Sequence, residues 1–427
     1  MKHALCVAFH YPPEASSSGV LRTLKYTRYL VDHGWRTTVI APAVDAYTTV
    51  DAELERQIPP TTRVLRTRYF NTKRHLAVRG LYPSIFAIPD RWIGWLPWGV
   101  RAGRRLLADD PFDLVYSTSP HATAHLIAWR VAKRARKPWV ADFRDPWIED
   151  PPEPGAPTGR VYTAANRWLE RRVAQECSAV VASTFHLKET LATRYPTLPA
   201  GKITAILNGY DEADFEDLPT CATATRERLV LLHAGSINRE FRNPIPLLRA
   251  ARALADAANI DLARIRFRFL GPGDFAFSRE MSEALDELRM RDTVEFLPRV
   301  PYSQSLAALA EADLLLLLQS SPDTTGLVPA KLYEYLRAQK PVLAMVHRGA
   351  TDEVLSLTGG GWSVAPESQE ALGGTLASAY SLWLQGDLAK TRANLSVLSR
   401  FDRKALAGEL AGLFESVVDR CRMSQPP

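Results

Sequence analysis

Two charged side chains one helical turn apart give this sequence its clearest chemical signal. Lys331 and Glu334 lie in the stretch "GLVPAKLYEYLRAQKPVLA" (residues 326–344), where apolar residues at helical spacing predict a helix that begins near Pro329. The Glu334 carboxylate would lean back toward the start of this helix, where it can accept two hydrogen bonds from a vicinal diol such as ribose. The alternative is a surface ion pair between the two side chains, worth only about 0.2–0.5 kcal/mol.

The start of the same helix is a candidate anion site. The first N–H groups of a helix have no partner within it. Those of Leu327, Val328 and Ala330 would therefore be available to hold a phosphate.

A second loop, "HAGSINREFRNP" (residues 233–244), offers positive charge in an equivalent place. Gly235 follows an expected strand, and Arg239 and Arg242 precede a helix that begins near Pro244. Guanidinium groups beside a helix N-terminus suit a pyrophosphate, because they combine charge with bidentate donors. The alternative is two solvated surface arginines.

The loop after the first expected strand, "HYPPEASSSG" (residues 10–19), argues against a nicotinamide or flavin cofactor. Dinucleotide-binding folds place G-x-G-x-x-G at this point, whereas this loop has the single glycine Gly19, and we find no P-loop. Glu14 and Gly19 would lie above the strand end, where a glycine lets a bulky substrate approach the backbone. An ordinary strand-to-helix connection is the alternative.

Apolar strands alternate with amphipathic helices along the chain, a pattern typical of α/β proteins with a parallel sheet covered on both faces. The pattern restarts after "KITAILNGYDEADF" (residues 202–215), so the 427 residues divide into two Rossmann-like, doubly wound domains that face a cleft. We expect these domains at residues 1–205 and 206–395, and a C-terminal helix over 396–427 as a candidate to cross back to the first domain. Ligands of such sheets bind at the carboxyl ends of the strands.

The charge is unevenly distributed. Residues 1–200 hold 28 Lys and Arg against 18 Asp and Glu, which leaves 25 against 29 for the rest of the chain. A basic first half indicates an anionic partner such as lipid headgroups or phosphates, with a solvated basic surface as the alternative. No nucleic-acid-binding module is recognisable, so we expect no nucleic-acid partner.

The stretch "DRWIGWLPWGVRAGRRLL" (residues 90–107) interleaves tryptophan with arginine, a combination that suits a membrane interface. Core tryptophans on a helix with a solvated basic face are the alternative. No apolar run approaches the roughly 20 residues of a membrane span, and the N-terminus looks like a strand rather than a signal peptide. The four cysteines are far apart, which indicates a reduced compartment. We expect a cytoplasmic protein, with contact to the inner membrane surface as a further expectation.

These motifs, in this order, resemble those of the family 4 glycosyltransferases of the GT-B fold, and the resemblance covers nearly the whole chain. It rests on "YPPEASSSG", "DLVYSTSPHATAHLIA", "KPWVADFRDPW", "ILNGYD", "HAGSINREFRNP", "FLGPGD" and "GLVPAKLYEYLRAQKPVLA". The "ADFRDPW" stretch is similar to that of bacterial members that build surface polysaccharides or glycoconjugates. The resemblance implies a nucleotide-diphosphate sugar in the C-terminal half and a saccharide or lipid-linked acceptor on the N-terminal half.

The resemblance also implies roles for the donor-side residues. Glu334 would be the second glutamate of the E-x7-E signature and would bind the ribose hydroxyls. Arg242, with Arg239, would bind the diphosphate, and Lys331 would add to their charge.

One residue departs from the family pattern. The first glutamate of the signature, which helps to hold the donor sugar, falls on Gly326, so backbone N–H groups of Gly326 and Leu327 would take its place. The peptide of Arg299 and Val300 would edge the nucleobase, and Val328 would line the donor site.

On the acceptor side, His121 follows a strand end and would orient the donor sugar or the acceptor hydroxyl, although a lone histidine is more often a structural hydrogen-bonding group. Asp145 is a candidate base. An ion pair of Arg144 with Asp142 or Asp145 that only orders the loop is the alternative. The expected acceptor-binding residues are Glu14, Gly19, His121, Asp142, Arg144 and Asp145, and the expected catalytic residues are Arg242, Lys331, Glu334 and His121.

Members of this family retain the anomeric configuration and need neither metal nor cofactor. Positive groups at the diphosphate stabilise the charge that grows as the glycosidic bond breaks, and the leaving phosphate can take the acceptor's proton. Two alternatives stay open: a nucleotide-sugar 2-epimerase of the same fold, and a non-catalytic scaffold protein that binds a nucleotide sugar.

Overall fold

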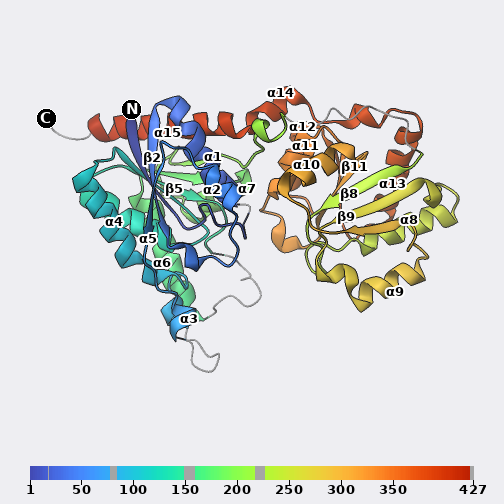
Figure 1. Cartoon of the computed structure of the whole chain (residues 1–427), viewed down its shortest axis with the longest axis horizontal. Helices are drawn as coiled ribbons and strands as arrows, with labels where there is room; N and C mark the ends of the chain where they lie inside the picture. Colours follow the sequence, from blue (N-terminus) through green and yellow to red (C-terminus); the bar gives the residue numbers. More distant parts are fainter. Residues whose placement is uncertain (18, 77–83, 149–158, 217–226, 424–427) are drawn as a thin grey trace. The chain divides into compact units, whose positions relative to one another are not determined.

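The computed structural model describes residues 1–17, 19–76, 84–148, 159–216 and 227–423, which form two compact units (Figure 1). One unit comprises Met1–Asn208 together with the C-terminal segment from Arg403, and the other comprises Gly209–Asp402. The chain therefore passes between the units twice.

The first unit is built on a seven-stranded parallel sheet of order β3-β2-β1-β4-β5-β6-β7. The strands are β1 (Lys2–Ala8), β2 (Trp35–Pro42), β3 (Arg63–Thr67), β4 (Leu114–Thr118), β5 (Trp139–Phe143), β6 (Ala179–Ala182) and β7 (Ile203–Ala205). In β1, Leu5 pairs with Thr38 and with Val115. Leu5 belongs to the core on one face of the sheet, and its neighbour Cys6 belongs to the core on the other. Both faces are therefore covered, as the alternation of strands and helices predicted.

The helices of the first unit divide between these two faces. They are α1 (Gly19–Tyr29), α2 (Ala52–Arg56), α3 (Thr72–Leu76), α4 (Leu96–Asp109), α5 (Thr123–Ala135), α6 (Arg160–Glu176), α7 (Phe185–Arg194) and α15 (Arg403–Met423). Helix α15 packs against α1, and the ring of Phe414 lies 5.3 Å from that of Trp35. The C-terminal helix therefore completes the core of the first unit, although the chain reaches it only after the second unit (Figure 1).

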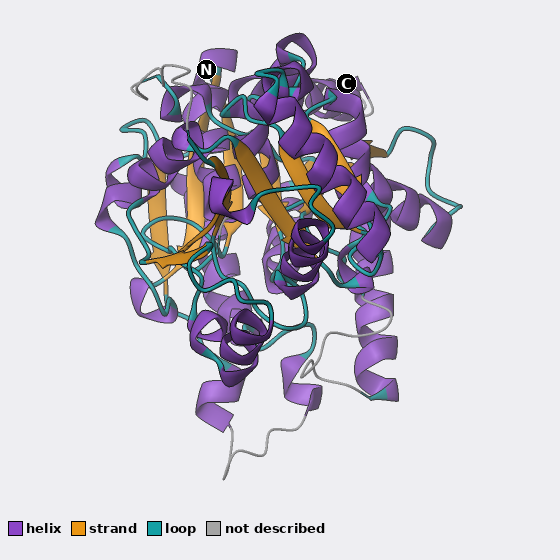
Figure 2. Ribbon diagram, turned by 90° about the vertical axis from the view of Figure 1, so that its right-hand side faces the viewer, coloured by secondary structure: helices purple, strands orange, loops and turns teal. Residues whose placement is uncertain are grey.

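The second unit has a six-stranded parallel sheet of order β10-β9-β8-β11-β12-β13. Its strands are β8 (Leu229–Ala234), β9 (Ile265–Leu270), β10 (Val294–Leu297), β11 (Leu314–Gln319), β12 (Val342–Val346) and β13 (Gly361–Val364). Its helices are α8 (Ile245–Asp256), α9 (Arg279–Glu287), α10 (Tyr302–Glu311), α11 (Ala330–Arg337), α12 (Ala350–Thr358), α13 (Gln369–Leu384) and α14 (Leu395–Leu398). Helices flank the strands (Figure 2). The expectation of two Rossmann-like parallel-sheet domains is thus confirmed.

Each sheet has one point where the strand order reverses direction, between β1 and β4 in the first unit and between β8 and β11 in the second. Loops that leave two such strands diverge to opposite faces of the sheet and leave a crevice between them. The loops after β1, β4, β8 and β11 hold most of the residues that the sequence singled out.

The tryptophans of residues 90–107 do not form a membrane-facing stripe. Trp92 and Trp95 are buried in the core of the first unit, and Trp98 is partly buried. The arginines of α4 remain exposed, so the alternative of core tryptophans behind a basic face is the one observed. Among the described residues, no helix is long and apolar enough to cross a membrane.

A buried arginine fixes the segment by which the chain leaves the first unit. Arg22 of α1 is 4% exposed, and its Nη2 and Nη1 donate to the carbonyl oxygens of Ile206 at 2.8 Å and Leu207 at 2.7 Å. Nη1 also lies 3.2 Å from Oδ1 of Asn208. The remaining donors reach the Asp142 carboxylate, at 3.1 Å from Nε and 3.0 Å from Nη2. Helix α1 and strand β5 therefore hold the exit segment together.

Asp142 was expected to bind the acceptor or to pair with Arg144, and the structure corrects both expectations. Its side chain is fully buried, pairs with Arg22, and also accepts from Tyr116 at 2.6 Å and Thr118 at 2.9 Å. Burial alone would raise the pKa of Asp142, but Arg22 and these hydrogen bonds outweigh it and lower the pKa. The pairing spans residues 120 positions apart, so no local pattern indicated it.

We predict that Asp142→Asn destabilises the protein by about 3–5 kcal/mol, because it leaves the buried Arg22 charge uncompensated. The matched control is Asp110→Asn, which breaks the ion pair of Asp110 with Arg36 in the same unit. The Asp110 side chain is 32% exposed and that of Arg36 is 34% exposed. An exposed pair contributes at most about 1 kcal/mol. Urea unfolding of both variants checks the difference, and equal losses would contradict the role of Arg22.

Candidate functional site

Helix α11 docks onto the carboxyl end of β8 through two side chains. Lys331 Nζ donates to the carbonyl oxygen of Ala234 at 2.6 Å, and the N–H of Ala234 donates to the hydroxyl of Tyr335 at 2.8 Å. The loops after β8 and β11 are joined as well, because the N–H of Ser320 donates to the carbonyl oxygen of Phe241 at 2.7 Å. These bonds fix the amino end of α11 at the reversal point of the second sheet.

Gly235 is required by this docking. Its φ is +117°, and a Cβ at this position would lie 2.6 Å from Nζ of Lys331. Any other residue would thus be strained and would push the ammonium group aside.

Two positive side chains lie close together at this point. The pKa of Lys331 is lowered to about 8 by burial and by the charge of Arg242, with Glu334 acting in the opposite direction. Arg242 also donates from Nη1 to Ser236 Oγ at 3.2 Å. A bound anion would relieve the repulsion between the two cations, so the arrangement is suited to a diphosphate.

Asn238, which the sequence reading missed, holds Arg242 in place. Its Oδ1 accepts from the N–H groups of Phe241 at 2.7 Å and Arg242 at 3.1 Å, and its own N–H donates to the carbonyl oxygen of Arg242 at 3.2 Å. An asparagine that bonds the backbone a few residues on is a known turn signal, so "SINREFRN" contained the information. Arg239, in contrast, is 76% exposed and lies 3.5 Å from Glu280.

The amino end of α11 differs in one detail from the expectation. The helix begins at Ala330 with Pro329 as its N-cap, and the N–H of Leu327 donates to Thr324 at 3.0 Å, so it is not available to a phosphate. Within the described ranges, the N–H groups of Val328 and Ala330 have no hydrogen-bond partner. The expected set of three donors is therefore reduced to these two.

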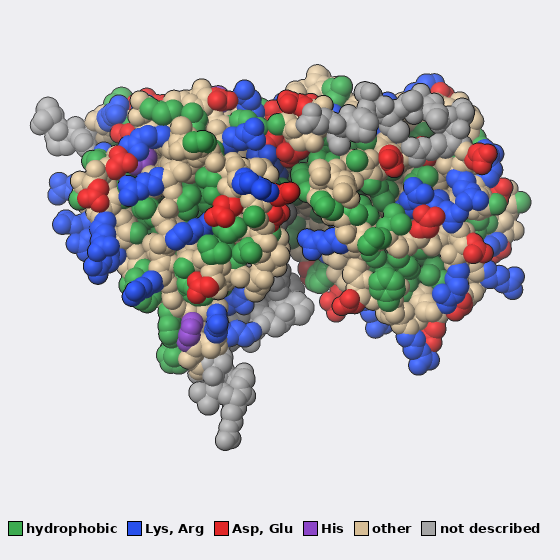
Figure 3. Space-filling model, in the orientation of Figure 1, with side chains coloured by type: hydrophobic (Ala, Val, Ile, Leu, Met, Phe, Trp, Pro, Cys, Tyr) green, Lys and Arg blue, Asp and Glu red, His purple; other side chains and the backbone are tan. Residues whose placement is uncertain are grey.

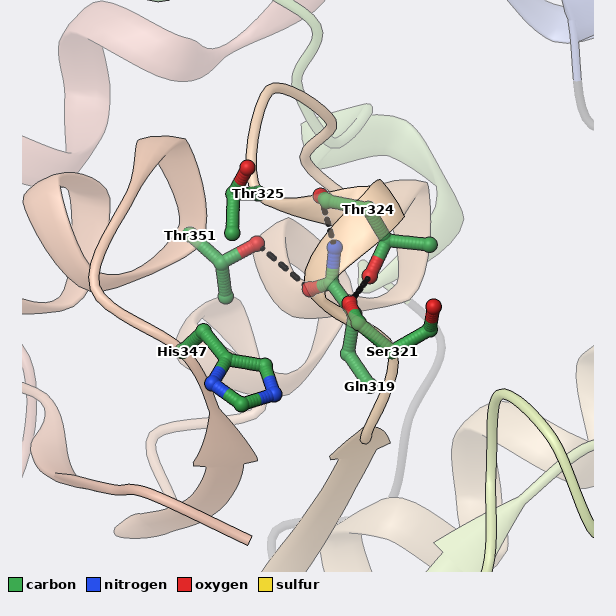
Figure 4. A pocket seen from close by; sticks show the side chains of 6 residues that line it. All are labelled: Gln319, Ser321, Thr324, Thr325, His347 and Thr351. Carbon is green, nitrogen blue, oxygen red and sulfur yellow. Dashed lines mark hydrogen bonds between the residues drawn. The ribbon is translucent and has the colours of Figure 1, made fainter. Parts of the chain in front are cut away.

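Polar side chains form hydrogen bonds to the backbone of residues 324–327, the loop that contains Gly326 (Figure 4). Gln319 Nε2 donates to the carbonyl oxygens of Thr324 at 2.6 Å and Leu327 at 3.1 Å. Thr351 Oγ1 lies 2.7 Å from Gln319 Oε1 and 2.9 Å from the carbonyl oxygen of Leu327. With Ser321, Thr325 and His347, these residues line a shallow polar pocket. A glutamine at the end of the apolar run of β11 was the only sequence signal for these hydrogen bonds.

Glu334 is partly exposed and accepts a hydrogen bond from the Tyr302 hydroxyl at 2.9 Å. Tyr302 begins α10 directly after the loop of Arg299 and Val300, so this bond brings Glu334 close to that loop. Arg299 also lies beside Gly271 after β9, where a Cβ would be 3.5 Å from the Arg299 Cα. The structure therefore places Glu334, expected at the ribose, near the loop of Arg299 and Val300 that was expected at the nucleobase.

In the first unit, the loops after β1 and β4 bring two histidines together. The rings of His10 and His121 stack, with centroids 5.3 Å apart and planes at 23°. Glu14 was expected to face the acceptor but is 1% exposed. It accepts instead from His10 Nδ1 at 2.9 Å and from the N–H of Ser16 at 2.7 Å.

His121 is partly buried, and burial together with the charges of His10, Arg91 and Arg144 holds its pKa well below the usual value. The ring is therefore neutral at physiological pH. The Arg144 guanidinium covers Gly19, where a Cβ would lie only 1.4 Å from Nη2. Gly19 thus makes room for Arg144 rather than for a substrate. Burial lowers the pKa of Arg144, and the charge of the nearby Asp145 acts in the opposite direction.

Two family models match most of the chain. Residues 19–209 match the family described as "Glycosyl transferase 4-like domain", and residues 222–396 match "Glycosyl transferases group 1". Curated protein sequences give no significant match.

Solved structures of the same fold include sucrose-phosphate synthase from Thermosynechococcus elongatus, which is 13% identical with a TM-score of 0.69 over 98% of this chain and 100% of that one. HepE from Anabaena in complex with UDP is 17% identical, with a TM-score of 0.68 over 97% and 100%. WaaG, a glycosyltransferase involved in lipopolysaccharide biosynthesis, is 14% identical, with a TM-score of 0.60 over 96% and 99%.

We predict that binding of inorganic pyrophosphate weakens as the pH rises above 8. In the free protein Lys331 loses its proton near pH 8, whereas a bound diphosphate favours the charged form and raises its pKa. Binding is therefore at full strength below pH 8 and requires uptake of a proton above it, so the affinity falls by up to about tenfold per pH unit. Calorimetry in two buffers of different ionisation enthalpy measures this proton uptake.

The control is Lys331→Met, which keeps the bulk of the side chain and has no proton to take up. Comparing the two proteins cancels the titration of pyrophosphate itself. The same pH dependence in both would show that Lys331 does not contact the anion.

Proposed function

Because the chain belongs to the family 4-like glycosyltransferases of the GT-B fold, we propose that it transfers a sugar from a nucleotide diphosphate to a hydroxyl acceptor with retention of configuration. The observation that supports the donor half of this proposal is the cation pair of Lys331 and Arg242 at the amino end of α11. The acceptor is a growing polysaccharide or glycoconjugate, bound by the loops of the first unit.

The donor site follows from the groups of the second unit. Arg242, Lys331 and the N–H groups of Val328 and Ala330 would hold the diphosphate, and Glu334 would accept from the ribose hydroxyls. In the free protein the Tyr302 hydroxyl donates a hydrogen bond to the Glu334 carboxylate. A ribose hydroxyl would replace this donor when the nucleotide binds. HepE has been solved with UDP and with UDP-glucose, which makes uridine nucleotides the first to test.

The chemistry of the step is electrostatic. As the bond between the anomeric carbon and the phosphate oxygen breaks, negative charge grows on the diphosphate and positive charge on the sugar. Arg242 and Lys331 stabilise the leaving group, a contribution that is larger in the transition state than in the ground state. Protein cations can supply this charge, so the proposal includes activity without a metal ion.

We propose in addition that the first unit contacts an anionic membrane surface, where a lipid-linked acceptor would be found. Lys and Arg side chains gather over α4 at the left edge of Figure 3. The exposed arginines of α4 are Arg101, Arg104 and Arg105, and α5 adds the exposed Arg130, Lys133 and Arg134. Each basic residue near an anionic surface contributes about 1 kcal/mol of attraction.

We predict that one nucleotide family among UDP, GDP, ADP and TDP sugars raises the melting temperature of the protein. The increase is largely lost in Arg242→Ala and in Glu334→Ala, because each removes a contact to the nucleotide, at an affinity cost of about tenfold or more. The control is Arg279→Ala, which removes a 90% exposed arginine of the same unit. Equal stabilisation of all four proteins would contradict the donor site.

The nucleotide sugar that this screen selects then tests the reaction. Nucleotide release should continue in excess EDTA, and proton NMR of the transferred sugar should show the anomeric configuration of the donor. Loss of activity with EDTA that a divalent metal restores would refute metal independence, and an inverted product would refute retention.

We predict that the protein floats with vesicles containing phosphatidylglycerol at low salt, and that Arg101→Glu, Arg104→Glu and Arg105→Glu together abolish this binding by reversing the charge of α4. Phosphatidylcholine vesicles should not bind either protein. The control reverses three exposed arginines of the second unit, Arg264, Arg279 and Arg291. If both triple variants float equally with the anionic vesicles, the basic face of α4 is not the contact surface.

A further inference from the structure

The pair of His10 and Glu14 lies at the carboxyl edge of the first sheet and has no role in the donor chemistry described above. Both residues lie in the loop that leaves β1. His10 Nδ1 is 2.9 Å from Glu14 Oε2, and the His10 side chain is 11% exposed while that of Glu14 is 1% exposed.

Glu14 carries a buried negative charge, and its hydrogen bond to His10 links that charge to a side chain that is partly exposed. Burial would raise its pKa, but hydrogen bonds from His10 and Ser16 lower the pKa overall, so the carboxylate is ionised at neutral pH. One oxygen is occupied by the N–H and hydroxyl of Ser16, and the other by His10. A buried carboxylate costs several kcal/mol of desolvation, and here it orients an imidazole that reaches the surface.

The bond to Glu14 leaves the other nitrogen of His10 available. A carboxylate at Nδ1 favours the tautomer that carries its proton there and leaves the Nε2 lone pair able to accept a proton. Among the residues that the structure describes, none makes a hydrogen bond to His10 Nε2. The ring is held in place by stacking on His121 and by an edge contact with Phe9 at 5.3 Å.

The position of the pair within the sheet matches that of the donor site in the other unit. The loop of His10 follows β1, and the loop of His121 follows β4, where the strand order reverses. The charged and titratable groups that face the two histidines are Glu14, Arg91 and Arg144, and Tyr47 lies within the field of Glu14. His121 is neutral, as shown above. His10 is therefore the imidazole of this edge that has a carboxylate partner.

We propose that His10, oriented by Glu14, accepts the proton of the hydroxyl group that attacks the sugar. This inference rests on the proposed function and deepens it by naming a base in the first unit. The acceptor oxygen forms its bond to the anomeric carbon, the bond from that carbon to the phosphate oxygen breaks, and its electron pair leaves with the nucleoside diphosphate. The hydroxyl proton moves to Nε2, and Glu14 stabilises the imidazolium until the proton passes to solvent.

Hydrolysis of UDP-glucose, or of the nucleotide sugar that the melting screen selects, provides a reaction in which water replaces the unknown acceptor. His10→Asn retains an amide donor for Glu14 and lacks a base, so we expect kcat for nucleotide release to fall roughly 10²-fold with little change in KM. Glu14→Gln removes only the charge and should lower kcat roughly tenfold. His186→Gln, at an exposed histidine of α7, should match the wild type.

Chemical rescue separates a base from a structural side chain. His10→Ala should regain activity when imidazole is added, and across a series of substituted imidazoles of similar size the regained rate should rise with their basicity. A ligand that merely refills the cavity would restore the rate without regard to basicity. Melting temperatures with and without UDP, measured for each variant, exclude loss of folding or of donor binding as the cause.

The two proposals fail in different ways. If the wild type neither binds nor hydrolyses any nucleotide sugar, the proposed function is wrong and the role of His10 with it. If the wild type turns over its donor while His10→Asn keeps the full rate, or if rescue is independent of basicity, only the role of His10 is refuted. A reduced rate with basicity-dependent rescue and unchanged donor binding supports it.

Discussion

The placement of Lys331 beside Arg242 is the constraint on which the second unit depends. Burial is the main cause of the lowered pKa of Lys331, and repulsion from the charge of Arg242 lowers it further. The protein maintains this placement by holding Lys331 against the carbonyl oxygen of Ala234 and by tying Arg242 into a turn through Asn238. The glycine at position 235 and the docking of Tyr335 serve the same arrangement. Because both cations are already held in place, an anion that binds here would not have to offset the free-energy cost of ordering them.

The two units solve the same geometric problem with different chemistry. Both sheets reverse their strand order at one point, and in both the loops at that point carry the polar side chains. In the second unit these loops present cations and N–H groups, whereas in the first they present a carboxylate and two imidazoles. Positive charge suits a diphosphate and an imidazole suits a hydroxyl, and the donor and acceptor roles that we propose for the two units follow these residue types.

The sequence predicted what is local or periodic. Alternating strands and helices gave the two parallel sheets, and the helical spacing of residues 328–336 placed α11 within a residue of its observed start. Gly235 and Arg242 could be named as candidate donor-site residues because they lie in the loop that directly follows an expected strand. The pairing of Arg22 with Asp142 could not be predicted, since it depends on the order of strands and helices in the folded unit. The hydrogen bond that removes the N–H of Leu327 from the anion site also escaped prediction, because it depends on a turn at Thr324.

The anchoring of the exit segment by Arg22 has a mechanical consequence. Because the carbonyl oxygens of Ile206 and Leu207 are clamped to α1, backbone rotation in this connection can begin only beyond Asn208. At that point Tyr210 forms a bridge with Asp402, and its N–H donates to the carbonyl oxygen of Phe401, so the outgoing and returning strands of the chain run side by side. The two links that join the units therefore lie side by side, and the outgoing one is held by α1 as far as Asn208.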